Sequence, residues 1–347
     1  MDWRMNETSV VIVGAGFSIA ATNGALPLMR NYFARLSQHR HSLLHDFVGS
    51  VAPDVATANV ERVLLSLDQI RTSPDGVLQG WADQWKVQIS ELHRQLADYT
   101  LERMRDSLQI SGDNWAAQLL ADCGPRTTVI SMNYDNIAEK ILSNRQGLRH
   151  GLRSPTCPHC KMRHLLMSAC SCEGRSDICE SDWRGAVIKP HGSIAWKRCL
   201  NTACCSFECL VADEHCQPFE PCGCPNCKHQ CGPVLVMPTM SKNLSDTPEI
   251  GVMWQAARFA IAEAESILFF GFSMPSSDEL LLQMIRQAIH QNRRLRRVAS
   301  IDLEPEAVLT RFEACIPSDQ EVTAIPLRVV PAETPHWLRT VNASQDM

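Results

Sequence analysis

The stretch Val11–Ser18 reads Val-Ile-Val-Gly-Ala-Gly-Phe-Ser, and it predicts a buried strand that ends in a glycine turn. The β-branched run Ser9–Val13 is typical of a strand that is covered on both faces. The turn leads into a helix, and this arrangement directs backbone N–H groups at a bound phosphate. The dehydrogenase fingerprint has a third glycine where this chain has Ile19, and an acidic residue about 20 positions further on, which this chain lacks. The stretch therefore predicts either a nucleotide site that does not serve hydride transfer or a tight structural turn.

Strands and helices alternate along the rest of the chain. Apolar residues spaced three and four apart in Val60–Ile70 and Trp81–Leu108 predict helices within residues 28–122. The later alternation is the pattern of a parallel sheet covered by helices, so the predicted fold class is α/β with a Rossmann-like parallel sheet. Further strands are expected at Thr127–Met132, Ala186–Ile188, Val234–Met237, Ser266–Phe270 and Arg297–Ile301, and helices at Ile137–Leu142, Gly251–Glu263, Glu279–Gln291 and Pro305–Cys315.

The composition of the 347 residues is that of an ordinary soluble globular protein, with 45% hydrophobic and 20% charged residues. The net charge of −5 and the sequence pI of about 6.2 argue against nucleic acid as a partner, because nucleic-acid-binding domains are usually basic. No run approaches the ~18 apolar residues of a membrane helix, so no membrane association is expected. No secretory signal is recognisable ahead of Ser9–Val13, and we expect a cytoplasmic protein.

The 16 cysteines are better explained by metal binding than by disulfides, because the cytoplasm is reducing. Fourteen of them lie between Cys157 and Cys231. Two closely spaced pairs, about 20 residues apart, match a four-thiolate zinc site. Such a site is closed, so the zinc is expected to be structural. The expected ligands are Cys199, Cys204, Cys224 and Cys227 for this site, and Cys157, Cys160, Cys170 and Cys172 for a second site.

Other cysteines keep the choice of ligands open. Five of the six left within the Cys-rich segment permit a third site or alternative ligands, and two histidines there can substitute for them. Cys123 and Cys315 lie in apolar surroundings and are expected to be core thiols. The alternative ligands are Cys205, Cys209, Cys216, Cys222, Cys231, His159 and His164.

Four further motifs carry polar residues at the ends of expected strands. Ligands of open α/β sheets bind at the carboxyl ends of the strands. An amide such as that of Asn133 suits the positioning of water or a ribose hydroxyl, and a histidine such as His191 suits the role of base near neutral pH. The alternative for His191, which precedes a glycine, is a turn histidine. The motifs are Ser131–Asp135 (SMNYD), Lys189–Trp196 (KPHGSIAW), Phe270–Ser273 (FGFS) followed by Asp278, and Ser300–Leu303 (SIDL).

In their order and spacing, these motifs and Val11–Ser18 resemble the sirtuin family, and in particular its sirtuin-like branch in bacteria. The resemblance covers residues 9–30, 128–142, 186–242 and 266–303. It implies one catalytic domain over residues 1–347, with a helical insertion at 31–122 and a Cys-rich zinc module at 151–233. It also implies that NAD is the substrate, and that the nicotinamide–ribose bond is broken instead of a hydride being moved.

The resemblance implies roles for individual residues. Asn133 and Asp135 would contact the ribose and the nicotinamide carboxamide, and His191 would act as the base through the ribose hydroxyls. Asp302 would bind a ribose diol or the adenine region, and the alternative for it is to cap the helix entered at Pro305. The positions implied to bind NAD are Gly14, Ala15, Gly16, Ser18, Arg30, Gly271, Ser273 and Asp302.

The chain departs from the family pattern in two places. The cofactor loop of sirtuins ends in Pro-Asp-Phe-Arg, whereas Pro27–Arg30 reads Pro-Leu-Met-Arg. The arginine is kept, and Met29 stands where an aromatic residue usually covers the nicotinamide pocket. Protein deacylases pair a Phe-Gly-Glu segment with the acyl-lysine peptide, and this chain has Val236–Thr239 there and no Phe-Gly-Glu. The second departure argues against an orthodox protein deacylase.

The leading hypothesis is an NAD glycohydrolase that releases nicotinamide and ADP-ribose. By resemblance, proteins of this type often deplete cellular NAD as antiphage effectors, and a homo-oligomer or a separate sensor or activator protein would control this one. The second hypothesis is an NAD-dependent deacylase or ADP-ribosyltransferase. The third is a non-catalytic, zinc-stabilised module that binds NAD or ADP-ribose as a signal.

Overall fold

A computed structural model describes most of the α/β core and parts of the Cys-rich segment. Among the described helices, none combines the length and apolar character that crossing a membrane requires. The described residues are 8–26, 32–72, 80–105, 114–124, 127–142, 149–150, 185–199, 201, 203–204, 211–212, 223–224, 227–236, 248–275 and 278–328.

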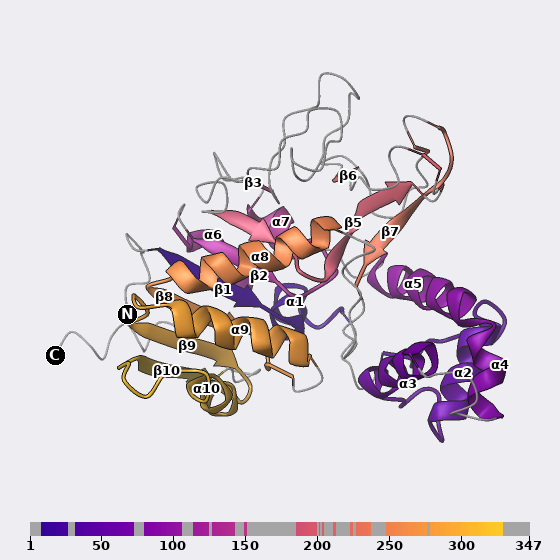
Figure 1. Cartoon of the computed structure of the whole chain (residues 1–347), viewed down its shortest axis with the longest axis horizontal. Helices are drawn as coiled ribbons and strands as arrows, with labels where there is room; N and C mark the ends of the chain where they lie inside the picture. The colour runs from indigo at the N-terminus through magenta and orange to yellow at the C-terminus, as the bar shows by residue number, and fades with distance from the viewer. Residues whose placement is uncertain are drawn as a thin grey trace.

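Seven parallel strands form the central sheet, in the order β10-β9-β8-β1-β2-β4-β3 (Figure 1). β1 lies between β2 and β8, so the chain extends the sheet first on one side of β1 and later on the other. The prediction of an α/β fold with a Rossmann-like parallel sheet is confirmed. The strands are β1 (Ser9–Val13), β2 (Thr128–Ser131), β3 (Arg149–His150), β4 (Ala186–Ile188), β8 (Ser266–Phe270), β9 (Arg297–Asp302) and β10 (Thr323–Arg328).

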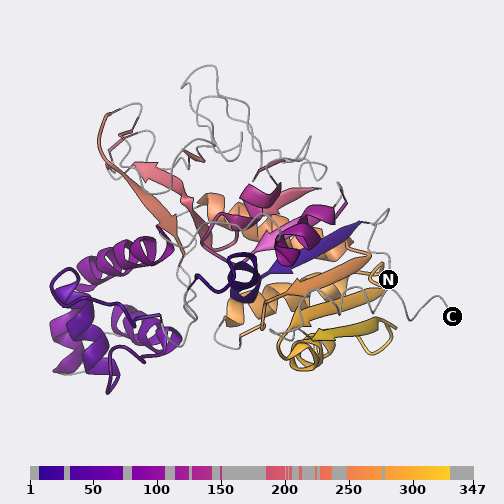
Figure 2. The same ribbon diagram turned by 180° about the vertical axis from the view of Figure 1, so that it is seen from behind.

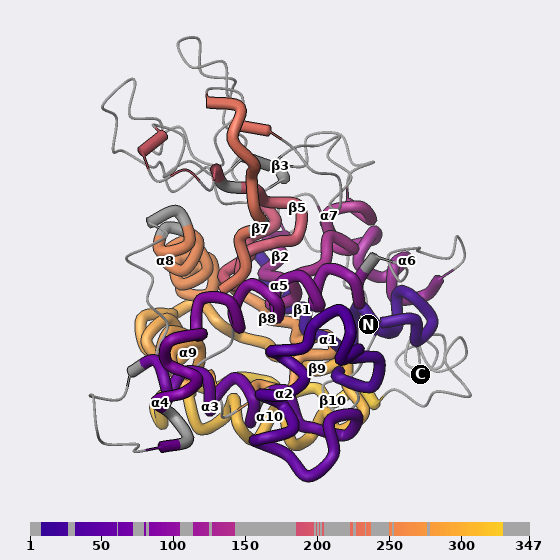
Figure 3. The backbone as a smooth tube through the Cα atoms, turned by 90° about the vertical axis from the view of Figure 1, so that its right-hand side faces the viewer, coloured from indigo at the N-terminus to yellow at the C-terminus, as the bar shows by residue number. Residues whose placement is uncertain are grey.

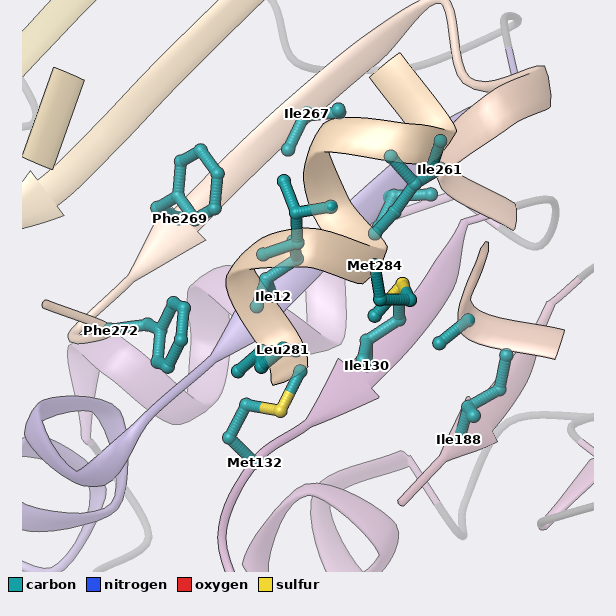
Figure 4. Packing of buried hydrophobic residues seen from close by; sticks show 14 of the residues in the cluster. Ile12, Ile130, Met132, Ile188, Ile261, Ile267, Phe269, Phe272, Leu281 and Met284 are labelled. Atoms are coloured by element: carbon teal, nitrogen blue, oxygen red, sulfur yellow. The ribbon is translucent and has the colours of Figure 1, made fainter. Parts of the chain in front are cut away.

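Helices cover both faces of the sheet (Figures 1 and 2). On one face, Val10 and Ile12 pack in a cluster with residues of α8, α9 and α10. Figure 4 shows Ile12 of this cluster near Leu281 and Met284 of α9. On the other face, Val11 and Val13 pack with residues of α1, α6 and α7. Both faces need apolar side chains, and this explains why β1 is a continuous apolar run from Val10 to Val13. The helices are α1 (Ala15–Ala21), α6 (Trp115–Asp122), α7 (Ile137–Leu142), α8 (Pro248–Glu263), α9 (Glu279–Gln291) and α10 (Pro305–Glu313).

The edge strand β10 was not expected from the sequence. It contains Pro326, which has no backbone N–H to donate to a ladder, and a proline weakens the strand pattern. In the described sheet β10 occupies the edge and pairs with β9. Proline is tolerated in such an edge strand. The formation of β10 therefore depends on its pairing with β9, and the local sequence pattern does not predict it.

Four helices between β1 and β2 form a lobe with its own apolar core, which includes Phe33, Leu67 and Tyr99. The lobe lies on the side of the molecule toward which the strands point, so it faces their carboxyl ends (Figures 1 and 3). α6 also falls within the predicted insertion 31–122, but it packs against α1 and α7 on the sheet. The helices of the lobe are α2 (Ser42–Val51), α3 (Val60–Thr72), α4 (Trp81–Lys86) and α5 (Ile89–Arg105).

A second, antiparallel sheet of three strands follows β4 and projects from the α/β core (Figure 1). β5 (Gly192–Cys199) pairs with β6 (Val211–Ala212) and with β7 (Cys231–Leu235). Gly192 pairs with Leu235 at the root of this β5–β7 ribbon, and Cys199 pairs with Cys231 at its tip. β7 begins before the strand expected at Val234–Met237, because its pairing with β5 extends out to the cysteines.

Candidate functional site

The candidate site lies at the carboxyl ends of β1, β2, β4 and β8. The sheet grows in opposite directions from β1, and ligands of open α/β sheets bind at such a switch point. The glycine turn follows β1, Asn133 follows β2, His191 follows β4 and Gly271 follows β8. Motifs that are distant in the sequence are therefore brought to one edge of the sheet.

The glycine turn packs directly against the turn that follows β8. Gly14 N donates to Phe270 O at 3.1 Å, and Gly16 N donates to Gly271 O at 2.9 Å. A Cβ atom on Gly271 would lie 2.1 Å from Phe17 N, and one on Gly14 would lie 2.5 Å from Gly271 O. Glycines are thus required by the close approach of two strand ends. Because the N–H groups of Gly14 and Gly16 have main-chain acceptors here, their contact with a phosphate stays a prediction.

Gly271→Ala is expected to lower the free energy of unfolding by roughly 3–4 kcal/mol, through overpacking and a left-handed backbone. Gly271 has φ +58°, and the added methyl would meet backbone atoms that cannot move aside as a side chain can. Gly24→Ala is the matched control, since Gly24 has φ +83° and nothing lies within 4 Å of its added Cβ. The control is expected to lose about 1 kcal/mol. Urea unfolding measures both, and equal losses would contradict the packing role of Gly271.

Asn133 connects the end of β2 to the glycine turn. Its Nδ2 donates to Gly14 O at 2.8 Å and to Ser18 Oγ at 2.7 Å. A carbonyl oxygen only accepts, so Gly14 O fixes which end of the amide carries the nitrogen. Oδ1 of Asn133 is left on the opposite side of the amide, as an acceptor suited to a hydroxyl or a water. Ser18, which was predicted to bind NAD, is buried and holds this amide in place.

Asp135 is buried, and its Oδ1 accepts from Ile137 N at 3.0 Å. This contact closes the turn that begins α7. The buried Lys189 donates to the carbonyl oxygen of Asp135 and forms an ion pair with Glu139 at 3.1 Å. The loop that carries Asn133 is therefore held by α7 and by the end of β4. The predicted contact of Asp135 with the substrate stays a prediction.

Both ring nitrogens of His191 face acceptors. Nε2 lies 3.0 Å from Asp278 Oδ2, and Nδ1 lies 3.2 Å from Met132 O. The side chains of His191 and Asp278 are 6% and 2% exposed. Asp278 also caps α9, because its Oδ1 accepts from Leu281 N at 3.2 Å. The sequence placed Asp278 in a motif without a role, since no local pattern reveals a partner on another strand end.

Two aromatic side chains flank His191, and the sequence analysis assigned a role to neither. The ring centroids of Trp254 and Tyr134 lie 6.0 Å and 6.4 Å from that of the imidazole. Burial raises the pKa of Tyr134 well above its usual value, and the nearby Tyr32 and Asp278 raise it further. Tyr134 therefore stays neutral. Because Tyr32 belongs to the segment that enters the helical lobe, this part of the lobe lies close to the site.

The root of the β5–β7 ribbon is fastened to His191. Val236 N donates to His191 O at 2.9 Å, and Val236 O accepts from the Tyr134 hydroxyl at 2.7 Å. Gly192 has φ +82°, and a Cβ atom on it would lie 2.3 Å from Val234 O. The glycine after His191 is thus needed for the chain to turn tightly into β5 against β7.

Other predicted NAD-binding residues have structural positions that neither support nor oppose that role. Ala15 begins α1, and Ser273 is exposed after β8. Asp302 ends β9, and its Oδ1 accepts from Glu304 N at 3.2 Å. The N-cap residue of α10 is Glu304, so the alternative that Asp302 caps this helix is wrong. Arg30 and the second predicted zinc set, Cys157, Cys160, Cys170 and Cys172, lie outside the described residues.

Four cysteines meet at the tip of the β5–β7 ribbon, and their Sγ atoms all lie within 4.8 Å of one another. The Sγ–Sγ distance is 3.5 Å for Cys199 and Cys227, and 3.7 Å for Cys204 and Cys224. A tetrahedral zinc ion with Zn–S bonds of about 2.3 Å places its ligands roughly 3.8 Å apart. The predicted grouping of these four residues is confirmed, and the donor set fits zinc.

The environment of Cys199 affects its protonation. Burial raises the pKa of Cys199 to about 12, against a backbone hydrogen bond at Asn201, and the thiols of Cys227, Cys224 and Cys204 raise it further. Without a cation the buried Cys199 thiol stays protonated, because a thiolate there would be poorly solvated. A bound zinc ion would deprotonate the cluster and hold the tip of β5 against Cys204, Cys224 and Cys227.

A surface cavity of about 700 Å³ lies at the amino ends of β8 and β9, away from the carboxyl ends that carry the candidate site. Arginines line it, and they face acids. Arg293 lies 3.5 Å from Asp319, and Arg294 lies 3.1 Å from Glu263. The cavity contains none of the predicted site residues, so the candidate chemistry lies at the carboxyl edge.

Comparisons with known proteins give a structural similarity and no family assignment. No family model matches the sequence, and no curated protein matches it. The chain resembles a solved structure of Sir2 in complex with the inhibitor EX-527, 2'-O-acetyl-ADP-ribose and a deacetylated p53 peptide. The TM-score is 0.40 and the identity 13%, over 98% of this chain and 94% of that chain. Since the similarity is this low, function rests on the site itself.

Proposed function

We propose that this chain is an NAD glycohydrolase, which cleaves NAD into nicotinamide and ADP-ribose. The observation that carries the proposal is the meeting of Asn133, His191 and the glycine turn at the switch point of the parallel sheet. Nucleotides bind at this edge in sheets of this kind. An oriented amide oxygen and a buried imidazole are suited to cleavage of a bond between ribose and a ring nitrogen.

Each residue has a part in the proposed reaction. The bond from ribose to nicotinamide breaks, its electron pair leaves with neutral nicotinamide, and positive charge develops on the ribose, as in other glycosidic cleavages. A water oxygen then bonds to the ribose carbon, and one proton is released. Asn133 Oδ1 would accept from that water or from a ribose hydroxyl. His191 would take up the released proton, directly or through a ribose hydroxyl.

A second candidate function, a non-catalytic module that binds NAD or ADP-ribose, is supported by one feature. Both nitrogens of His191 face acceptors, so in this arrangement the ring offers no lone pair to a substrate. Deacylase and ADP-ribosyltransferase activities depend on an acceptor-binding cleft. That cleft is expected near Val234–Lys242, of which residues 237–242 lie outside the described residues.

In ¹⁸O-labelled water, the wild-type protein is expected to convert NAD into equal amounts of nicotinamide and ADP-ribose, with one labelled oxygen on the ribose. Asn133→Ala is expected to reduce the rate by about 10²-fold or more, as loss of an oriented polar group in an active site does. Ser18→Ala removes one of the two acceptors that orient Asn133, so it is expected to reduce the rate less. Chromatography and mass spectrometry of the products measure the rate and the label for the wild type and the two variants.

Asn59→Ala serves as the control, because the Asn59 side chain accepts from Arg62 N in the first turn of α3, in the helical lobe. Binding of NAD without release of nicotinamide contradicts the hydrolase and supports the sensing module. Formation of acylated ADP-ribose from an acyl-lysine peptide supports the deacylase instead.

We also propose that the activity depletes cellular NAD in antiphage defence in the cytoplasm, under control of a homo-oligomer or a separate sensor. The sequence resemblance supports this role. Bacteria that express the wild type are expected to lose NAD after phage infection, and cells that express Asn133→Ala are expected to keep it. Equal NAD levels in the two would contradict the role.

A further inference from the structure

Asp278 joins two elements that are distant in the sequence. It stands at the N-terminus of α9, where Oδ1 accepts from Leu281 N, and its other oxygen lies 3.0 Å from His191 Nε2. Its side chain is 2% exposed, so water does not compete for these contacts. A helix cap needs one oxygen, and the second oxygen of Asp278 is used for His191.

The contacts of His191 determine its protonation. Met132 O only accepts, so Nδ1 carries a hydrogen, and the carboxylate also only accepts, so Nε2 carries one too. The N–H of Leu281 and the positive end of α9 favour the charged form of Asp278. These contacts favour an imidazolium beside a carboxylate, and an imidazolium must lose a proton before it acts as a base.

We propose that Asp278 is a positioning residue for His191, which fixes the ring, favours its protonated form and selects Nδ1 as the nitrogen that exchanges the proton. The inference rests on the proposed NAD cleavage. The contact with the carboxylate is charge-assisted, and such hydrogen bonds are roughly twice as strong as those to a neutral carbonyl. The hydrogen on Nδ1, 3.2 Å from Met132 O, is therefore the one that leaves. The Nδ1 lone pair then faces the buried carbonyl of Met132, the residue that precedes Asn133.

Other groups near His191 do not replace Asp278. Tyr134, in the loop after β2, stays neutral because burial raises its pKa. Lys189, at the end of β4, is directed to Glu139 and to the carbonyl oxygen of Asp135. Trp254 of α8 carries no group that titrates in this range. Since Asp278 stabilises the cation, it moves the proton loss of His191 to higher pH.

Two substitutions separate this role from the helix cap. Asp278→Asn and Asp278→Ser both keep an oxygen that can cap α9. Asparagine turns an N–H₂ group toward Nε2, so the neutral ring must carry its hydrogen on Nδ1, whereas serine is too short to reach the ring. The full chain with ¹⁵N-labelled histidine is titrated by NMR, and His191→Gln identifies the signal among the 12 histidines. NAD consumption and thermal unfolding are measured over the same pH range.

In the wild type, the neutral ring is expected to carry its hydrogen on Nε2. In Asp278→Ser, the ring is expected to lose its proton about one pH unit or more below the wild type, and the acid limb of kcat/KM is expected to move by the same amount. Asp278→Asn is expected to carry the hydrogen on Nδ1 and to lower kcat/KM by roughly 10²–10⁴-fold, since the corresponding change in the Ser-His-Asp triad costs about 10⁴.

The proposal is overturned if the wild type and Asp278→Ser lose the proton at the same pH, or if the neutral wild-type ring carries its hydrogen on Nδ1. Activity that falls only in step with the melting temperature would reduce Asp278 to a helix cap. A wild type that consumes no NAD contradicts the proposed function, and the NMR titration then still decides whether Asp278 fixes His191.

Discussion

His191→Gln is expected to lower NAD turnover by about 10²–10⁴-fold, the usual value of a general base, while the protein stays folded. Glutamine keeps a side-chain N–H for the Asp278 carboxylate, which is buried against the ring. Alanine would leave that carboxylate without its partner, and an uncompensated buried charge typically costs about 3–5 kcal/mol. The two variants therefore separate loss of chemistry from loss of stability. Initial rates and urea unfolding of both variants measure the difference.

The control for this pair is His39→Gln, at an exposed position in the segment that precedes α2. It is expected to leave turnover and stability unchanged. If His191→Gln keeps most of the wild-type rate, His191 is not the base, and the histidine then has the structural role of holding Asp278 and the β5–β7 ribbon.

We also propose that the four-cysteine cluster binds a structural zinc ion. Removal of this ion, by a chelator or by Cys224→Ser, is expected to unfold the β5–β7 ribbon and to abolish activity. A structural zinc site contributes on the order of 10 kcal/mol, which is comparable to the whole stability of a domain. Unfolding of the ribbon is expected to displace His191, because β5 runs from Gly192, next to His191, to Cys199 in the cluster. The carbonyl oxygen of His191 also accepts from Val236 N. Zinc content, circular dichroism and turnover measure the effect.

Cys123→Ser is the matched control, because the Cys123 thiol lies outside the cluster and donates to Leu119 O. It is expected to keep the zinc content and the activity of the wild type. If a chelator removes the metal while the melting temperature and the rate stay constant, the cluster does not support the site.

The strands that build the site were predictable because each is defined by the residues within it and directly beside it. β1, β2, β4, β8 and β9 lie within a residue or two of the expected ranges, since short apolar runs bounded by glycine or polar residues suffice to define buried strands. The four ligands of the cysteine cluster were predictable for a similar reason. Close pairs such as Cys224 and Cys227 constrain the metal geometry by spacing alone.

The contacts that give the site its chemistry were not predictable in this way. Asp278 meets His191 because β8 and β4 end at the same edge of one sheet, and this depends on the strand order. The direction of the Asn133 amide depends on Gly14 and Ser18, which follow a different strand. α6 and β10 likewise depend on the neighbours they pack against or pair with.

The sequence by itself determined the α/β class, the strand ends that carry the polar residues and the main cysteine set, because periodicity and spacing act over a few residues. Only the tertiary structure decided that Asp278 lies against His191, that Asn133 presents its oxygen, and that the glycines of two turns pack on each other. These are pairings between segments brought together by the order of the strands, and a local pattern does not contain that order.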